Sequence, residues 1–136
     1  LLAITFTTPG MAAEFWLVLF AAVLPCYGLL PLIPTRPPRA FLLPAPPAGS
    51  APRLFRRANV TFLATFGNTW NTLPSGHAAG AAAVAVMAER SGSPFAPAFL
   101  LLAIGIAMGT VRGRYHYVVD TVSGVMLGIA AAVVLG

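Results

Sequence analysis

The feature that most constrains this chain is a run of twenty residues, Glu14 to Ile33, that carries no charge after its first residue. A helix needs about 20 apolar residues to cross the hydrocarbon core of a bilayer. The whole chain of 136 residues is 58% hydrophobic and 8% charged, whereas a soluble domain carries about 25% charged residues. The sequence therefore predicts an integral membrane protein, and residues 1–136 are expected to form a single domain.

Three further apolar segments, residues 75–89, 95–111 and 117–135, complete the predicted fold. Together with 14–33, which Pro25 is expected to kink, they predict an all-α membrane bundle of about four spanning helices. Residues 1–6 resemble the tail of a helix and residues 7–10 a turn, so we expect the bundle to be N-terminally truncated. The proline-rich segment 34–52 predicts a loop, and 53–67 predicts an amphipathic helix in the membrane interface.

This order of crossings brings most of the polar side chains that could bind a ligand or take part in catalysis to one membrane face. The seven residues expected there are Arg36, Arg39, His77, Arg112, Arg114, His116 and Asp120. Ionisable side chains that converge within a membrane bundle indicate a functional site. All eight basic residues are arginine and none is lysine. Because no basic run is interleaved with aromatic residues in a soluble fold, the net charge of +5 favours anionic headgroups or phosphates as partners, and not nucleic acid.

Two short stretches carry the chemistry. His116 and Asp120 are four residues apart, so they share one face of a helix, and the carboxylate can orient the imidazole. In "PSGH", residues 74–77, Ser75 is a good helix N-cap and Gly76 allows close approach of a ligand. The N-terminus of the following helix favours an anion, and a protonated His77 beside a bound phosphate is a proton donor.

These motifs resemble those of the type 2 phosphatidic acid phosphatase superfamily, integral-membrane helical bundles that dephosphorylate lipid phosphates. "PSGH" is similar to the second family motif, "RYHYVVD" (114–120) to the end of the third, and "LPLIPTRPPR" (30–39) to the first. The usual arginine six residues before the histidine is replaced by Thr110, and the usual lysine before Arg36 by Leu29. This arrangement is similar to the branch that includes inositol phosphorylceramide synthases.

The resemblance implies a mechanism without a metal or other cofactor. His116 would attack phosphorus and form a phosphohistidine, Asp120 would orient it, and His77 would protonate the leaving alcohol and then activate water. The residues implied to bind phosphate are Arg36, Arg39, Ser75, Gly76, Arg112 and Arg114; which of the arginines do so stays open. The three carboxylates of the chain are too scattered along the sequence to predict a magnesium site.

The expected function is hydrolysis of a lipid phosphate monoester or a polyprenyl diphosphate. Two alternatives remain: a lipid phosphotransferase with an alcohol acceptor, and a non-catalytic membrane scaffold. The intact histidine pair with Asp120 argues against the scaffold. The expected partners are a lipid phosphate and the bilayer, and the sequence does not predict an oligomeric state.

The membrane side of the site is predicted differently by two criteria. Seven arginines fall on the site's face and Arg90 alone on the other, and the positive-inside rule then favours the cytoplasm. The family resemblance implies the outer face. Since several of these arginines are expected to bind phosphate, we expect a bacterial inner-membrane protein whose site faces the extracytoplasmic side.

Overall fold

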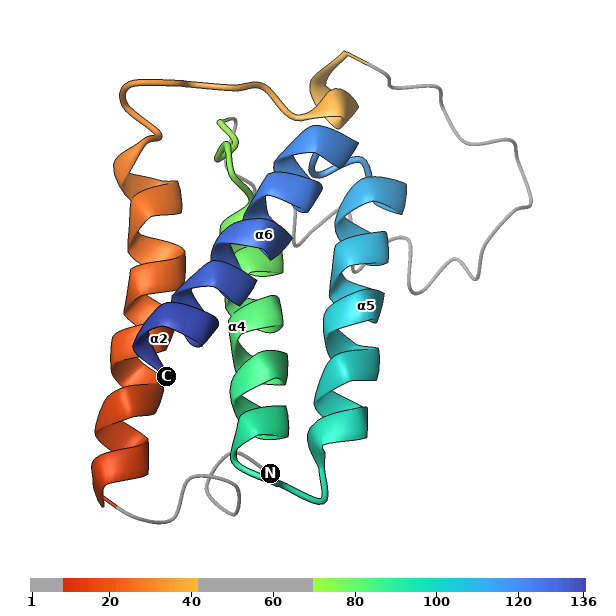
Figure 1. Cartoon of the computed structure of the whole chain (residues 1–136). Coiled ribbons are helices and arrows are strands. Elements are labelled where there is room, and N and C mark those ends of the chain that lie inside the picture. Colours follow the sequence, from red (N-terminus) through yellow and green to blue (C-terminus); the bar gives the residue numbers. More distant parts are fainter. Residues whose placement is uncertain (1–8, 42–69) are drawn as a thin grey trace, which may run out of the picture.

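The computed structural model describes residues 9–41 and 70–136, and these form a helical bundle (Figure 1). The helices are α2 (Pro9–Gly28), the 3₁₀-helix η1 (Pro38–Ala40), α4 (Gly76–Arg90), α5 (Ala96–Arg112) and α6 (Val118–Leu135). α2, α4 and α5 lie side by side, and α6 runs obliquely across α4. The predicted all-α membrane bundle is confirmed. The predicted helix at 53–67 and most of the proline-rich loop lie outside the described residues.

The last three helices begin and end within one residue of their predicted bounds, but the first does not. α2 starts at Pro9, several residues before the predicted start, because proline suits the first helical position, where its missing N–H is not needed. The turn predicted for 7–10 is therefore wrong at Pro9 and Gly10. Pro25 lies inside α2 without ending it. The helix stops at Gly28, before Pro31 and Pro34, and residues 29–33 form hydrogen-bonded turns.

Helix α4 is the centre of the bundle and contacts the other three helices. Its 15 residues extend for about 22 Å at 1.5 Å per residue, which is less than the roughly 30 Å of bilayer hydrocarbon. Among the described helices, two are long and apolar enough to cross a membrane, at Gly10–Gly28 and Val118–Leu135; α5 is apolar but shorter. Most residues of α4 are buried against the neighbouring helices. Large apolar side chains on α5 and α6, such as Leu101 (71% exposed) and Val134 (77%), face outward.

Helices α4 and α6 pack with their backbones in contact. Gly124 and Gly128 lie one helical turn apart on α6, against the carbonyl groups of Ser75 and Ala79. A Cβ atom added at either glycine would collide with one of these carbonyl oxygens. Small residues at such spacing let helices approach closely in membranes, and here they fix the separation between α4 and α6.

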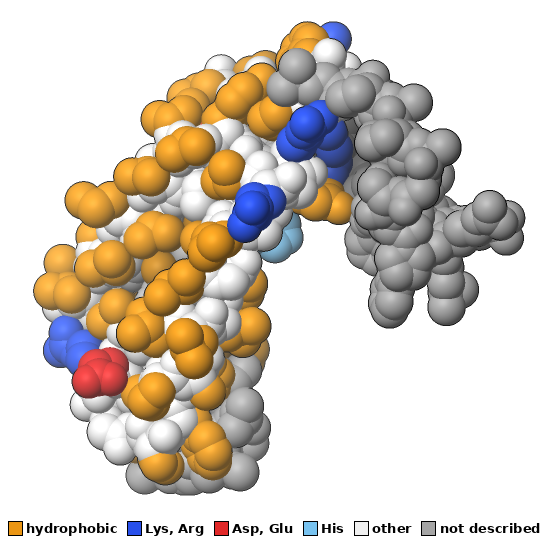
Figure 2. All heavy atoms as spheres, turned by 90° about the vertical axis from the view of Figure 1, so that its right-hand side faces the viewer, with side chains coloured by type: hydrophobic (Ala, Val, Ile, Leu, Met, Phe, Trp, Pro, Cys, Tyr) orange, Lys and Arg blue, Asp and Glu red, His pale blue; other side chains and the backbone are white. Residues whose placement is uncertain are grey.

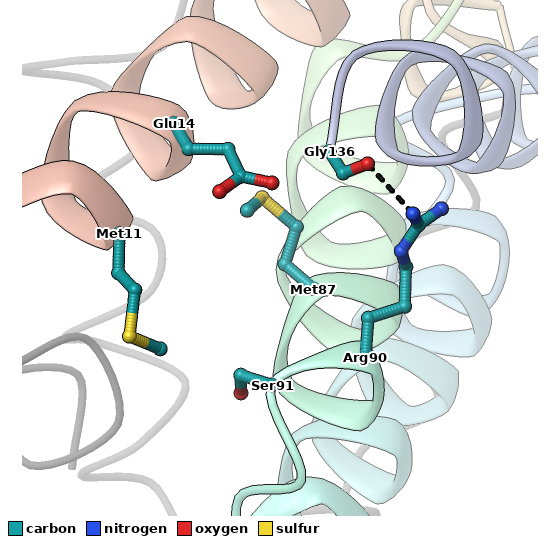
Figure 3. Close-up of a pocket in the computed structure, with 6 residues that line it drawn as sticks. All are labelled: Met11, Glu14, Met87, Arg90, Ser91 and Gly136. Atoms are coloured by element: carbon teal, nitrogen blue, oxygen red, sulfur yellow. Dashed lines mark hydrogen bonds between the residues drawn. The ribbon is translucent and has the colours of Figure 1, made fainter.

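At the opposite end of α4 and α6, Arg90 links the two helices by hydrogen bonds. Its guanidinium donates hydrogen bonds to the carbonyls of Gly136 at 2.6 Å and of Ala132 and Val133 at 3.3 Å. A cation at the C-terminal end of a helix also interacts favourably with the helix dipole. Beside it lies a pocket of about 270 Å³, which Glu14 and Met87 help to line (Figure 3).

The glycine contact predicts that Gly128→Ala destabilises the bundle. The added methyl group must push α6 away from Ala79, and overpacking of this kind costs roughly 1–3 kcal/mol. Thermal unfolding in detergent should therefore show a lower midpoint for Gly128→Ala. The matched control is Gly105→Ala on α5, where the new Cβ meets nothing within 4 Å and the midpoint should stay or rise slightly. Equal midpoints for the two variants would contradict this role of Gly128.

Candidate active site

The two histidines of the chain meet at one end of the bundle. His77 lies in the first turn of α4, and His116 lies just before α6. Their ring centroids are 6.2 Å apart, which is too far for a direct hydrogen bond between ring nitrogens. On one face of the molecule, basic side chains and a histidine gather toward one end, beside a mostly hydrophobic surface (Figure 2). The predicted convergence on one face is thus observed for the described residues, with Arg90 at the opposite end.

His116 is buried, and two polar side chains face its Nδ1 atom. The Asp120 carboxylate, also buried, lies 3.5 Å from Nδ1, at the outer limit of a hydrogen bond. The same Asp120 oxygen accepts the Tyr117 backbone N–H at 3.1 Å. The side-chain nitrogen of Asn71 is closer to Nδ1, at 2.9 Å. The predicted pair of His116 and Asp120 is therefore brought together, but a third residue makes the shorter contact.

The surroundings of His116 favour its uncharged form. Burial lowers the pKa of His116 below the ordinary 6.5, and the nearby charges of His77 and Arg39 lower it further. The Asp120 carboxylate opposes them and raises the pKa, but burial outweighs it. Near neutral pH, His116 is therefore a neutral imidazole, the form that has a nucleophilic lone pair.

The "PSGH" turn caps α4 as predicted. Ser75 is fully buried, and its hydroxyl accepts the Ala78 N–H at 3.4 Å. Its own backbone N–H donates to the Asp120 carbonyl at 2.8 Å, which ties the start of α4 to the start of α6. The Gly76 N–H points to the Thr72 hydroxyl at 3.4 Å, a long contact. A Cβ at Gly76 would lie 3.1 Å from the Tyr27 ring, so the close approach that this glycine allows is that of an aromatic side chain.

The arginines differ in their relation to the histidines. The Arg39 guanidinium stacks over the Tyr115 ring at 4.5 Å, and among the described arginines it is the one whose charge lowers the pKa of His116. Arg36 is exposed and lies 5.5 Å from the Trp70 ring. Arg112 and Arg114 are exposed at the end of α5 and just after it. The structure thus brings Arg39 into the site most directly, a choice that the sequence left open.

Thr110 has a structural role at the position where the usual family motif has arginine. Its carbonyl accepts the backbone N–H groups of Tyr115 and His116 at 2.9 and 3.0 Å. Within the loop from Thr110 to Tyr115, Arg114 has a left-handed backbone (φ 57°), and its carbonyl accepts the Arg39 N–H at 3.1 Å. This tight loop reverses the chain and presents His116 to α4.

Two functional candidates were missed by sequence reasoning, Asn71 and Tyr115. Asn71 opens the stretch "NTLPSGH", but it stands in a loop, where no periodicity predicts the direction of a side chain. Tyr115 lies between the two recognised residues Arg114 and His116. The proximity of Asn71 to a motif was the available signal, and it does not identify a contact across 45 residues of sequence.

A model of the PAP2 superfamily matches residues 1–134, which is nearly the whole chain. The chain belongs to the PAP2 superfamily. Membership supports a membrane protein with a phosphatase- or phosphotransferase-type activity. No curated protein and no solved structure matches the chain significantly. The resemblance of this PAP2 protein to the inositol phosphorylceramide synthase branch stays a prediction, as do its substrate and the membrane side of the site.

The electrostatics of this PAP2 site predict how His116 titrates. Its pKa should lie below 6.5, and Asp120→Asn should lower it further, because the carboxylate that stabilises the imidazolium is removed. Titration of ¹⁵N-histidine-labelled protein by NMR, with His77→Gln used to assign the signals, measures both values. A pKa above 6.5, or one that rises in Asp120→Asn, would be inconsistent with this description.

Proposed function

We propose that this PAP2 protein is a metal-independent lipid phosphatase that hydrolyses a lipid phosphate monoester or a polyprenyl diphosphate through a phosphohistidine. The observation that carries the proposal is the histidine pair, one ring buried and the other exposed, with centroids 6.2 Å apart. Two similar groups in different environments can take opposite roles in acid–base and nucleophilic chemistry. Arg39 adds a cation beside them, which a phosphate requires and an ordinary structural pair does not.

In the first step, His116 is the nucleophile. The lone pair on Nε2 attacks phosphorus, and the bond between phosphorus and the lipid oxygen breaks. A protonated His77 gives its proton to that oxygen, so a monoester releases a neutral lipid alcohol and a diphosphate releases a polyprenyl phosphate. Burial supports this assignment because it keeps His116 uncharged, while the exposed His77 can acquire a proton from solvent.

In the second step, His77 acts as a base. Now neutral, it takes a proton from a water molecule as the water oxygen attacks phosphorus. The bond between phosphorus and Nε2 breaks, its electron pair returns to His116, and inorganic phosphate leaves. His77 ends protonated, so the cycle can repeat. The start of α4 and the arginines would stabilise the charge on the phosphoryl oxygens, as phosphoryl transfer requires.

An alcohol in place of water would make the protein a lipid phosphotransferase. The arrangement around Thr110 favours this second candidate, since it resembles a branch of synthases. Both reactions share the first step and the same histidine roles. They differ in the product, which is free phosphate in one and a new phosphomonoester of the acceptor alcohol in the other.

The first functional prediction concerns the histidines. Phosphate release from a panel of lipid phosphates, in detergent with EDTA, should persist in the wild-type protein and be lost in His116→Ala. His77→Ala should reduce it by on the order of 10²–10⁴-fold, the usual range for general acid–base catalysis. The matched control is Glu89→Ala at the opposite end of α4, which should retain activity. Activity that disappears in EDTA, or that is unchanged in His116→Ala, would refute the mechanism.

The second prediction ranks the arginines. Hydrogen bonds to charged groups contribute about 1.5–3 kcal/mol, so Arg39→Ala should weaken competitive inhibition by inorganic phosphate roughly 10- to 100-fold. Arg39→Lys, which keeps the charge, should be affected less. Arg36→Ala should change it by no more than about threefold, because Arg36 is exposed and screened by solvent. Equal effects of Arg36→Ala and Arg39→Ala would overturn this ranking.

A further inference from the structure

The side chain of Asn71 contacts the proposed nucleophile more closely than Asp120 does. Its amide nitrogen lies 2.9 Å from His116 Nδ1, compared with 3.5 Å for the Asp120 oxygen. The same amide nitrogen donates to the backbone carbonyl of Tyr115. Since a carbonyl only accepts hydrogen bonds, the atom between it and the ring must be the NH₂ group, and its second hydrogen points to Nδ1.

Asn71 itself is held on both sides of its backbone. Its N–H donates to the Thr35 carbonyl at 2.7 Å, and its carbonyl accepts the Thr35 hydroxyl at 2.8 Å. This antiparallel bridge joins the loop before α4 to the segment that carries the first motif. With the backbone fixed in this way, a half-turn of the amide would place its oxygen against the Tyr115 carbonyl, so the orientation with the NH₂ group between that carbonyl and the ring is favoured.

Nδ1 of His116 thus faces two groups with opposite requirements. The Asn71 N–H requires a lone pair on Nδ1, which places the proton of a neutral ring on Nε2. The Asp120 carboxylate favours a proton on Nδ1, which leaves the lone pair on Nε2. In the structure the Asn71 contact is the shorter, and the Asp120 oxygen that lies 3.5 Å from Nδ1 also accepts the Tyr117 N–H.

We propose that Asn71 is a positioning residue for His116, which holds the resting imidazole as the tautomer protonated on Nε2, in opposition to Asp120. The inference rests on the proposed function for its consequence: Nε2 must lose its proton before it attacks phosphorus. The ring gives the Nε2 proton to water and gains a proton from water at Nδ1, where Asp120 accepts its hydrogen bond. The charge of the ring is unchanged. The protein therefore rests with its nucleophile masked, and the tautomer must change before Nε2 can attack phosphorus.

The test is the tautomer itself, read from the ¹⁵N chemical shifts of the His116 ring near neutral pH. The wild-type protein should show the proton on Nε2. Asn71→Leu, which removes the donor at similar size, should move the proton to Nδ1. Thr35→Val is the control, because it removes the hydroxyl contact to the Asn71 backbone and keeps the Asn71 amide. It therefore perturbs the loop without removing the donor, and the proton should stay on Nε2.

The pH dependence of kcat/KM is a second test of the Asn71 contact with His116. The charged and titratable groups that act on His116 are Asp120 from α6, His77 from α4 and Arg39 from η1. Loss of the Asn71 donor destabilises the neutral ring, so the acid limb of kcat/KM should move to higher pH by roughly half to one unit in Asn71→Leu. Asn71→Asp, which has the same shape and adds a carboxylate, should move it further and also place the proton on Nδ1.

Two results would overturn the inference: a wild-type ring protonated on Nδ1, or a tautomer that Asn71→Leu and Asn71→Asp leave unchanged. If Asn71→Leu does not fold, Asn71→Asp alone decides. The tautomer is measured without substrate, so this outcome is separate from the proposed function. An inactive protein with the predicted tautomers would refute the phosphatase and keep the role of Asn71.

Discussion

The contact between the backbones of α4 and α6 determines the geometry of the histidine end. Gly124 and Gly128 let α6 lie directly on the Ser75 and Ala79 carbonyls, and the Ser75 N–H then reaches the Asp120 carbonyl at 2.8 Å. Both histidines stand at the starts of these two helices. Because any larger residue at the contact would separate the helices, the distance between the rings depends on it.

The site shows how a membrane bundle can hold ionisable groups in an apolar setting. They lie at the ends of the helices, where the His77 side chain is exposed, while His116 and Asp120 are buried behind it. Burial penalises the charged form of His116 more than the Asp120 carboxylate stabilises it. The arrangement therefore separates a buried, neutral histidine from a solvent-exposed one, although both have the same side chain.

Much of the fold could be predicted from the sequence, and the site only in part. Helices α4, α5 and α6 were predicted within one residue because apolar runs between clear turns determine their bounds; α2 was misplaced because Pro9 suits the start of a helix as well as a turn. Counting crossings placed both histidines at one end. The contact of Asn71 with His116 and the proximity of Arg39 to the site depend on loops that meet only in the folded chain. Periodic patterns in the sequence do not predict such contacts.

The mechanism requires a covalent bond between His116 and phosphorus, and this intermediate can be trapped. A lipid phosphate labelled with ³²P, mixed with the protein and quenched in base, should leave label on the protein as a phosphohistidine, which survives base and is lost in acid. Peptide mapping should locate the label at His116, with more label in His77→Ala if loss of the base slows hydrolysis. Label at His77, or turnover with no labelled protein in either form, would show that His116 is not the nucleophile.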